Sequence, residues 1–542
     1  MHHRVALLTV VLTTCAQSAR LVAQEHDHHQ QIGRLGRVVF PISCTAQARQ
    51  RFEHAMALLH SFWWEEGDRA FGQVLEADSS CAMAYWGKAL NAWGNAFAGG
   101  PSGAGLTYGA ESARHASSLP AGTARERGFI AATAALYRNP DSTSNSARLQ
   151  SYADSMARLY QRFPKDVEVA IYYALSQLAT APRTDTTFAQ QKGAIAVLDP
   201  LFAQHPDHPG LAHYVIHATD SPGLARLGLD AARRYAKIAP AAPHAQHMPS
   251  HIFVRLGLWN ETIASNWKSY QAGYEYAKAM GIAGTMEEFH AMDYAVYGYL
   301  QRGQDSAARA AVARAMRAKP SLRGLVSDYN RTAMAARVPL ERGDWSAAAE
   351  LRAPAESLGP VASALLRFTH AIGSARSGRP EAARPEVKAL DSITTALEQK
   401  GEPYWSRVVR IKHDAAEAWV LWAAGHSAGA RALARAAADS EEVTDKHQVT
   451  PGELLPAREL EGDMLLMAGR YAEARAAYKG TLVREPKRAR SLFGVARAAE
   501  LAGDRDAAAA GYREFLGLMA SADGNRPELA TAREFLKTFS SY

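Results

Sequence analysis

The residues best suited to chemistry in this sequence are histidines gathered in one stretch of the chain. Of the 20 histidines, six fall between positions 213 and 290, with two aspartates in matching positions. Counted back from Gly223, positions −10, −6 and −3 hold His213, His217 and Asp220. Positions −13, −10 and −6 hold His244, His247 and His251 before Gly257, and His290, Asp293 and Tyr297 before Gly303. Steps of three and four residues keep side chains on one helical face, so each segment predicts a stripe of polar ligands.

Side chains of these types bind transition metals. Imidazoles and carboxylates from three neighbouring helices can supply the three or four ligands that Zn²⁺, Cu²⁺ or Fe²⁺ requires. We expect the ligands to be His213, His217, His247 and His251. A second group could complete the shell, orient the ligands from behind or bind a second ion: Asp220, His244, His290 and Asp293. Tyr214, Trp259 and Tyr297 are the expected walls of the site.

Two other uses of these histidines stay open. They could bind a peptide or polar ligand without metal, or they could simply pack between helices. Pro249 also affects the geometry, because proline does not fit inside a helix. If a helix begins there, His244 and His247 lie on a loop and their register is approximate.

The elements that must position these residues are helices. From Ala48 onward the chain is rich in Ala, Leu, Arg and Glu, with apolar residues at three- and four-residue spacing. The clearest repeat is 34 residues long, since Gly469, Ala474 and Tyr478 recur as Gly503, Ala508 and Tyr512. The same glycine-to-small-residue step recurs at Gly223 and Gly228, Gly303 and Ala308, and Gly343 and Ala348. A glycine suits the turn between two helices, and a small residue lets them approach closely.

This pattern resembles the tetratricopeptide (TPR) repeat of an exported bacterial type. The resemblance implies an all-α superhelix of stacked helical hairpins, covering most of the chain at irregular intervals. In such arrays one face of each first helix lines a concave groove, so a protein or peptide ligand in that groove is the partner that the resemblance implies.

The chain divides into five expected parts. Residues 1–23 have the order of a secretory signal peptide, and residues 24–44 form an N-terminal tail. N-terminal hairpins over 45–137 include a Gly-rich loop at 99–109. Central repeats over 148–375 carry the histidines, and C-terminal repeats cover 376–542.

The leader predicts an exported protein, either periplasmic or secreted. We do not expect lipid anchoring at Cys15, because Thr replaces the smaller residue usual in a lipoprotein box. No later stretch reaches the roughly 18 apolar residues of a membrane span, so no transmembrane segment is expected. Cys44 and Cys81 are the cysteines left after cleavage, and export favours a disulfide between them over two buried thiols.

Composition excludes several classes of protein. With 47% hydrophobic residues in 542, the chain can build a large core, so disorder is not its main state. The net charge of +7 contains no block of five or more like charges, so no nucleic-acid partner is predicted. No H-E-x-x-H, phosphate-binding or dinucleotide-binding motif occurs. The G-H-S-A-G segment at 425–429 follows a helical run, so Ser427 is interpreted as a turn residue.

Two functions remain. The first is an exported binding scaffold with a histidine-rich divalent-metal site on its concave face. The alternative is a metal-dependent hydrolase or oxidoreductase on the same solenoid, with Glu287 or Glu288 moving protons. Zinc, copper or iron is the expected cofactor if these histidines bind metal, and otherwise no cofactor is expected.

Overall fold

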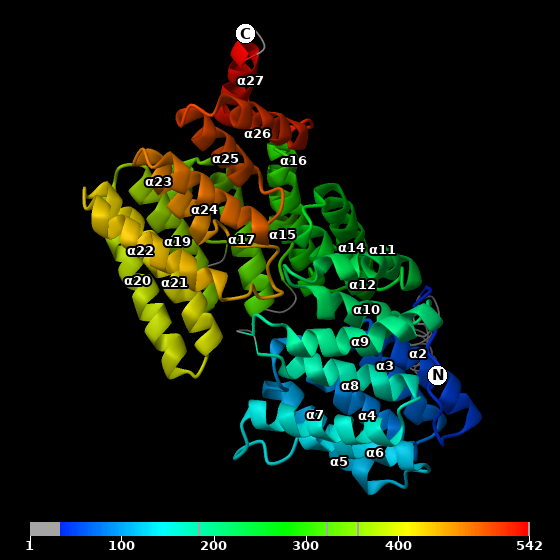
Figure 1. The fold of residues 1–542 in the computed structure, drawn as a ribbon. Helices are drawn as coiled ribbons and strands as arrows, with labels where there is room; N and C mark the ends of the chain where they lie inside the picture. The colour runs from blue at the N-terminus through cyan, green and yellow to red at the C-terminus, as the bar shows by residue number, and fades with distance from the viewer. Residues whose placement is uncertain (1–32, 183–184, 321–323, 355–356, 540–542) are drawn as a thin grey trace, which may run out of the picture.

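The computed structural model describes residues 33–182, 185–320, 324–354 and 357–539. The predicted signal peptide over 1–23 and the first part of the predicted tail lie outside these residues. Within them the regular structure is helical, and the only extended pairing is an isolated bridge between Gly284 and Pro320. Figure 1 shows the helices stacked in sequence order.

The helices follow one another with short connections. The N-terminal ones are α2 (Ala46–His60), α3 (Trp64–Ala77), α4 (Ala82–Trp93), η1 (Ala96–Ala98), α5 (Gly103–Ser118), α6 (Ala124–Leu136), α7 (Asn145–Arg162), α8 (Val167–Thr180) and α9 (Ala189–Gln204). The central ones are α10 (Pro209–Thr219), η2 (Ala225–Gly228), α11 (Leu229–Ile238), α12 (Pro243–His247), α13 (Pro249–Arg255), α14 (Trp259–Met280), α15 (Met286–Gln301), α16 (Asp305–Arg317) and α17 (Leu325–Arg342). The C-terminal ones are α18 (Trp345–Ala349), α19 (Pro360–Arg376), α20 (Pro380–Gln399), α21 (Pro403–Ala423), α22 (Ser427–Glu442), α23 (Ala457–Met467), α24 (Tyr471–Arg484), α25 (Ala489–Leu501), α26 (Arg505–Leu518) and α27 (Pro527–Phe539).

The hairpins have the turns that the sequence predicts. Gly303, Gly469 and Gly503 adopt positive φ angles of 67°, 74° and 82° directly after a first helix. The small residues five positions later, such as Ala474 and Ala508, are completely buried. Consecutive helices pack against each other along the chain, as α14 does on α15 and α25 on α26. The predicted TPR-like all-α superhelix is therefore confirmed. Gly223 is an exception, because its φ is not positive and η2 extends the connection.

Two features of the N-terminal region bear on the predictions. Cys44 and Cys81 form a disulfide, with their Cα atoms 5.4 Å apart, which confirms the predicted bridge. The predicted loop at 99–109 is only partly a loop, because α5 begins at Gly103. Glycines serve there as contact residues: a Cβ on Gly105 would lie 2.8 Å from the carbonyl oxygen of Ala92.

Apolar packing groups the helices differently from the predicted divisions. One core joins buried residues from Leu35 to Phe253 and so crosses the expected boundary between 137 and 148. A second core runs from Tyr329 to Met464. Between α22 and α23, the connection over 443–456 leaves its own hairpins and contacts the central helices, where Arg255 pairs with Asp445 at 3.0 Å. The 443–456 connection and the central helices, which are far apart in sequence, therefore enclose the region between them.

None of the described helices combines the length and the apolar character needed to cross a bilayer.

Candidate metal centre

The six clustered histidines come together at the centre of the molecule. His213 and His217 lie on α10, His244 and His247 on α12, His251 on α13 and His290 on α15. Their side chains form two groups whose nitrogens lie within 4.8 Å of one another. We call His213, His217 and His244 triad 1, and His247, His251 and His290 triad 2. The two triads adjoin, since the ring centroids of His244 and His247 are 6.2 Å apart.

The short helix α12 resolves the effect of Pro249. Pro243 and Pro249 each occupy the first turn of a helix, where a missing N–H costs little. The helical turn over 243–247 puts His244 into triad 1 and His247 into triad 2. The junction between two proline-led helices thus gives one segment a ligand for each triad.

Triad 1 converges through its Nε2 atoms. His213 Nε2 lies 3.0 Å from His217 Nε2 and 3.2 Å from His244 Nε2. The Nδ1 of His213 donates to the carbonyl oxygen of His60 at 2.6 Å, so its Nε2 carries a lone pair. The Nδ1 of His217 has no hydrogen-bond partner among the described residues. All three rings contact Phe62, with centroid distances of 4.5 to 6.0 Å.

Phe62 reaches this position through an uncommon backbone conformation. Its φ is 53°, in the left-handed region that a bulky side chain rarely adopts. The residue follows α2 and turns the chain into α3, which lays its ring over triad 1. Strain of this kind persists where the surrounding structure holds it, and here it covers the histidines with an apolar side chain.

In triad 2, hydrogen bonds determine which ring nitrogen of His247 and of His251 carries the proton. His247 Nε2 and His251 Nε2 are 3.0 Å apart. His247 Nδ1 donates to Asn266 Oδ1 at 2.6 Å, and the Asn266 amide nitrogen is committed to the carbonyl oxygen of Thr262. His251 Nδ1 donates to Asp220 Oδ2 at 2.9 Å. Both Nδ1 atoms therefore carry the ring proton, and in the neutral rings two lone pairs face each other.

Burial keeps these rings neutral. It lowers the pKa values of His213, His217, His247 and His290 well below the ordinary value, and neighbouring histidines lower them further. Burial also lowers the pKa of His251, although Asp220 opposes the shift. Two facing imidazole lone pairs at 3.0 Å repel unless a cation lies between them.

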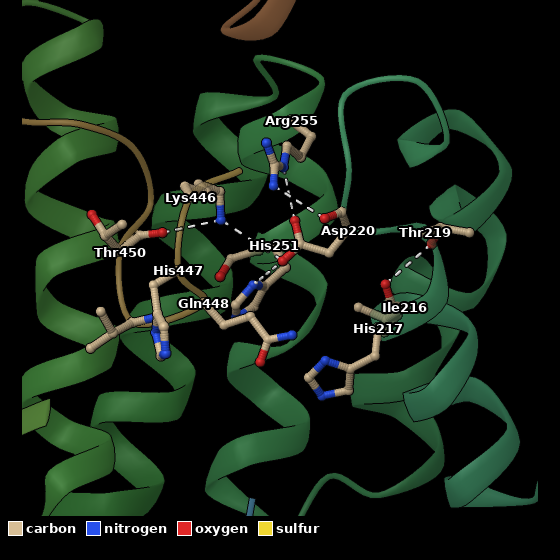
Figure 2. Close-up of polar contacts among 12 residues, drawn as sticks. Ile216, His217, Thr219, Asp220, His251, Arg255, Lys446, His447, Gln448 and Thr450 are labelled. Atoms are coloured by element: carbon tan, nitrogen blue, oxygen red, sulfur yellow. Dashed lines mark hydrogen bonds and ion pairs between the residues drawn. The ribbon is translucent and has the colours of Figure 1, made fainter. Parts of the chain in front are cut away.

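Asp220 anchors triad 2 from behind, as Figure 2 shows. Its carboxylate accepts from His251 and from Arg255 Nε, each at 2.9 Å. Burial would raise the pKa of Asp220, but Lys446 and Arg255 outweigh it and hold the pKa well below its usual range. Lys446 lies 3.8 Å away and belongs to the 443–456 connection. Burial lowers the pKa of Lys446 to about 8.

The histidine face is covered rather than open. His213 and His247 are fully buried, and His251 is 2% exposed. Phe62 covers triad 1, and the 443–456 connection packs over triad 2, where Tyr294 Oη donates to the carbonyl oxygens of Gln448 and Thr450. At this point the structure does not present the histidines along a free groove.

Two cavities include a histidine of triad 1 among their lining residues. One of about 300 Å³ is lined mainly by aromatic and aliphatic residues and ends at His244 and Glu287. The other, of about 220 Å³, is more polar and ends at His217 and Asp220 beside Lys446. Each cavity therefore has one histidine of triad 1 in its lining.

Glu287 stands close to both triads. Its Oε1 lies 3.5 Å from His244 Nδ1, and its Oε2 is buried without a hydrogen-bond partner among the described residues. Burial would raise the pKa of Glu287, but the nearby His244 and His290 outweigh burial and lower it. The neighbouring Glu288 is different, because it caps α15 through Thr285.

A third cluster, formed by His60, Glu168 and His208, lies behind triad 1. His60 Nε2 and His208 Nε2 donate to opposite oxygens of Glu168 at 3.1 and 2.9 Å. The remaining nitrogen of His60 faces Tyr214 Oη at 3.1 Å, and that of His208 accepts from the backbone N–H of Leu211. The cluster supports triad 1 because the carbonyl of His60 holds His213.

Several predicted site residues lie elsewhere. Asp293 is fully buried and pairs with Arg337 at 2.8 Å, so it contacts no histidine of either triad. Trp259 and Tyr297 pack against each other, and their polar atoms bind Lys487, Glu485 and Arg488. Tyr214 does line the region, stacked on His213. His290 is held differently from the other ligands, since Asn330 donates to its Nδ1 at 3.3 Å.

Sequence reasoning missed the residues that orient the ligands. Phe62 and His60 come from segments outside the histidine stretch, whereas Asn266 lies within it on α14, and no spacing connects any of the three to the ligands. The sequence did contain one signal for the arrangement of the 243–255 segment. Pro243 and Pro249 stand at the starts of its two halves, and a proline at the first helical position predicts two short helices.

Comparisons with known proteins add little to this description. No family model matches the chain, and no curated protein matches it. Among solved structures, yeast Tom70 shares 9% identity, with 91% of this chain and 90% of that chain covered, at a TM-score of 0.29. A monomeric mutant of IFIT1 with Gppp-AAAA shares 12% identity over 84% and 90%, at 0.35. The TPR domain of P58(IPK) shares 14% over 70% and 100%, at 0.21. None reaches a TM-score of 0.5. The fold of this chain is therefore assigned from its own helices and not from these structures.

Proposed function

We propose that this protein is a metal-dependent enzyme whose helical-hairpin array positions two adjacent transition-metal sites, one on each triad. The observation that carries the proposal is the pair His247 and His251. Their Nε2 atoms are 3.0 Å apart while both Nδ1 atoms donate outward, to Asn266 and Asp220. This arrangement supports a cation because only a positive charge between the rings offsets the repulsion of their lone pairs.

The remaining distances fit the same proposal. Tetrahedral metal–nitrogen bonds of about 2.0–2.1 Å put ligand nitrogens about 3.3 Å apart. The separations in triad 1 are 3.0 and 3.2 Å. Imidazole donors suit zinc, copper, iron and nickel. Ligand histidines typically donate their other N–H to a carbonyl or carboxylate, as His213 and His251 do.

Each site has at most three histidine ligands, which favours catalysis over a structural role. Structural zinc sites close with four protein ligands, whereas catalytic sites keep a position for substrate or water. An ion bound here would polarise a substrate oxygen or activate water. The chain itself supplies two cavities lined in part by histidines of triad 1, an apolar wall from Phe62 that excludes water, and Glu287, which is placed to accept a proton.

Export is a further part of the proposal. It is supported by the disulfide between Cys44 and Cys81, which suits an oxidising compartment. A protein or peptide partner elsewhere on the array stays a prediction of the resemblance.

Elemental analysis and metal titration test the central proposal. Protein purified without chelator should hold close to two ions per chain, and chelated protein should take up two equivalents of zinc or copper. Changing His217 and His251 together to Ala should abolish uptake while helical content stays unchanged. The matched control changes His370 and His413, which lie outside both triads, and should still bind two ions. Equal uptake by the two double variants would show that the ligands are wrong.

A further inference from the structure

The apolar cavity that ends at His244 and Glu287 has features of a binding site that the metal ligands alone do not require. Its volume of about 300 Å³ is in the range of small-molecule sites. The walls come from four separate parts of the chain, and they include Trp63, Trp64, Tyr276 and Met286. At its rim Ile282 is 46% exposed, an uncommon position for a large aliphatic residue.

The aromatic side chains of one wall form a continuous series that leads to triad 1. Trp64 stacks on Phe62 with a centroid distance of 5.3 Å. Phe62 in turn stacks on His244 at 5.5 Å. On the same segment Trp63 meets Tyr276 edge to face at 5.3 Å. A planar ring entering the cavity would find stacking and edge contacts, which favour aromatic over aliphatic ligands.

Three polar atoms of lining residues have no hydrogen-bond partner among the described residues, and one of them, His244 Nδ1, lies 3.5 Å from Glu287 Oε1. Glu287 Oε2 is a buried acceptor, and Trp64 Nε1 is a buried donor. Buried polar groups without partners are rare, and each costs free energy until something satisfies it. A ligand with a hydroxyl group can donate to Glu287, whereas a carboxylate would meet a like charge there.

From these contacts we propose that the cavity binds a hydroxylated aromatic ring, with the hydroxyl directed toward Glu287 and His244. The inference rests on the proposed function in one respect, since it makes this molecule the substrate presented to triad 1. The chain's own role is to stack the ring against the aromatic wall and to accept the hydroxyl proton's hydrogen bond at Glu287 Oε2.

Calorimetric titration of the full-length chain with 2-naphthol tests the inference. We expect one molecule to bind to both the chelated and the metal-loaded protein. The analogue 2-methylnaphthalene has the same shape without the hydroxyl, and 2-naphthoate carries a negative charge. To chelated protein, both should bind at least about tenfold more weakly than 2-naphthol, because a hydrogen bond to a carboxylate is among the stronger ones.

Two matched substitutions locate the contact. Glu287→Gln should weaken 2-naphthol binding by about five- to tenfold, because the bond is no longer charge-assisted. Glu288→Gln makes the same change one residue away and keeps the helix cap, so it should bind like the unchanged protein. Trp64→Phe keeps an aromatic ring on this wall and removes the N–H together with the second ring of the indole, and its far-ultraviolet spectrum should stay native. Equal affinity for 2-naphthoate, or equal effects of the two Glu variants, would overturn the inference.

The two proposals fail separately. Binding of two ions without binding of 2-naphthol would overturn the substrate class and leave the metal centre. Binding of 2-naphthol to a chain that takes up no metal would support the cavity and overturn the metal centre.

Discussion

Two groups of buried histidines lie side by side in this molecule, and their hydrogen bonds differ in kind. In the cluster of His60, Glu168 and His208, both Nε2 atoms donate to the carboxylate and both remaining nitrogens have partners. In triad 2, the Nδ1 protons of His247 and His251 point outward while their Nε2 atoms face each other. The first cluster is complete as protein, whereas triad 2 leaves two imidazole lone pairs facing each other, which is the feature on which the proposed metal centre rests.

The difference shows that a count of nearby ligand-type residues does not identify a metal site. All three groups bring three such side chains within 4.8 Å. What separates them is which nitrogen the surrounding structure protonates. A carboxylate inside a cluster consumes the imidazole protons, whereas acceptors placed outside it leave the lone pairs converging.

Metal loading should produce the largest effect. Each ion bound at a thousandfold excess over its dissociation constant stabilises the folded state by about 4 kcal/mol, so two ions contribute about 8 kcal/mol. We expect thermal unfolding of loaded protein to occur well above that of chelated protein. An unfolding temperature that stays unchanged after chelation would contradict the proposed difference between the triads and the cluster of His60, Glu168 and His208.

The pH dependence of the chelated protein should be steep and specific in sign. Five triad histidines, His213, His217, His247, His251 and His290, have folded-state pKa values below the ordinary one. Below about pH 6.5 the unfolded chain binds protons that the folded chain does not, so stability is present above that pH and lost as the pH falls.

Each of these histidines contributes at most about 1.4 kcal/mol per pH unit. The charged groups facing them are Asp220, Glu287 and Lys446, of which the two carboxylates reduce the slope. Urea unfolding at pH 7, 6 and 5 measures how the free energy of unfolding changes per pH unit. Stability that rises toward pH 5 would contradict the neutral assignment of the rings.

Substitution of one residue in each region sharpens the comparison. Glu168→Leu leaves two buried imidazole donors unpaired, so it should lower the free energy of unfolding by about 3–5 kcal/mol. In chelated protein His217→Leu should cost about 1 kcal/mol or less, because the Nδ1 of His217 has no partner to lose. Urea titration gives both values, and the reverse order would show that His217 is structural.

The smallest effect concerns the residues behind the ligands. Asn266→Leu removes the acceptor that orients His247, and loss of such a partner typically lowers metal affinity by 10- to 100-fold. Only the ion of triad 2 should weaken, so a competition titration should show one unchanged and one weakened site. Equal weakening of both would show that the variant disturbs the whole centre.

Most of the fold could be predicted from the sequence because its signals are local. The glycines at the turns and the small residues five positions later, such as Gly469 and Ala474, determine a hairpin within about 34 residues. The helix that starts at Gly103 was missed because glycine content predicts a loop, whereas here Gly105 permits close contact with Ala92.

The candidate site was predictable only along each helix. Helical spacing identified the histidine stripes, but it could not assign His244 and His247 to different triads, since that depends on the break at Met248. Asp293 shares the register of the ligands, yet Arg337 from α17 neutralises it. Contacts between distant segments, such as Phe62 on triad 1, leave no trace in the spacing of residues.

Anomalous diffraction from crystals of the loaded protein, measured at the absorption edge of the metal, tests the central claim most directly. We predict two peaks, one among His213, His217 and His244 and one among His247, His251 and His290, with none between His60 and His208. Crystals of protein saturated with zinc or copper that show no peak at either triad, or a peak at Glu168 instead, would contradict it.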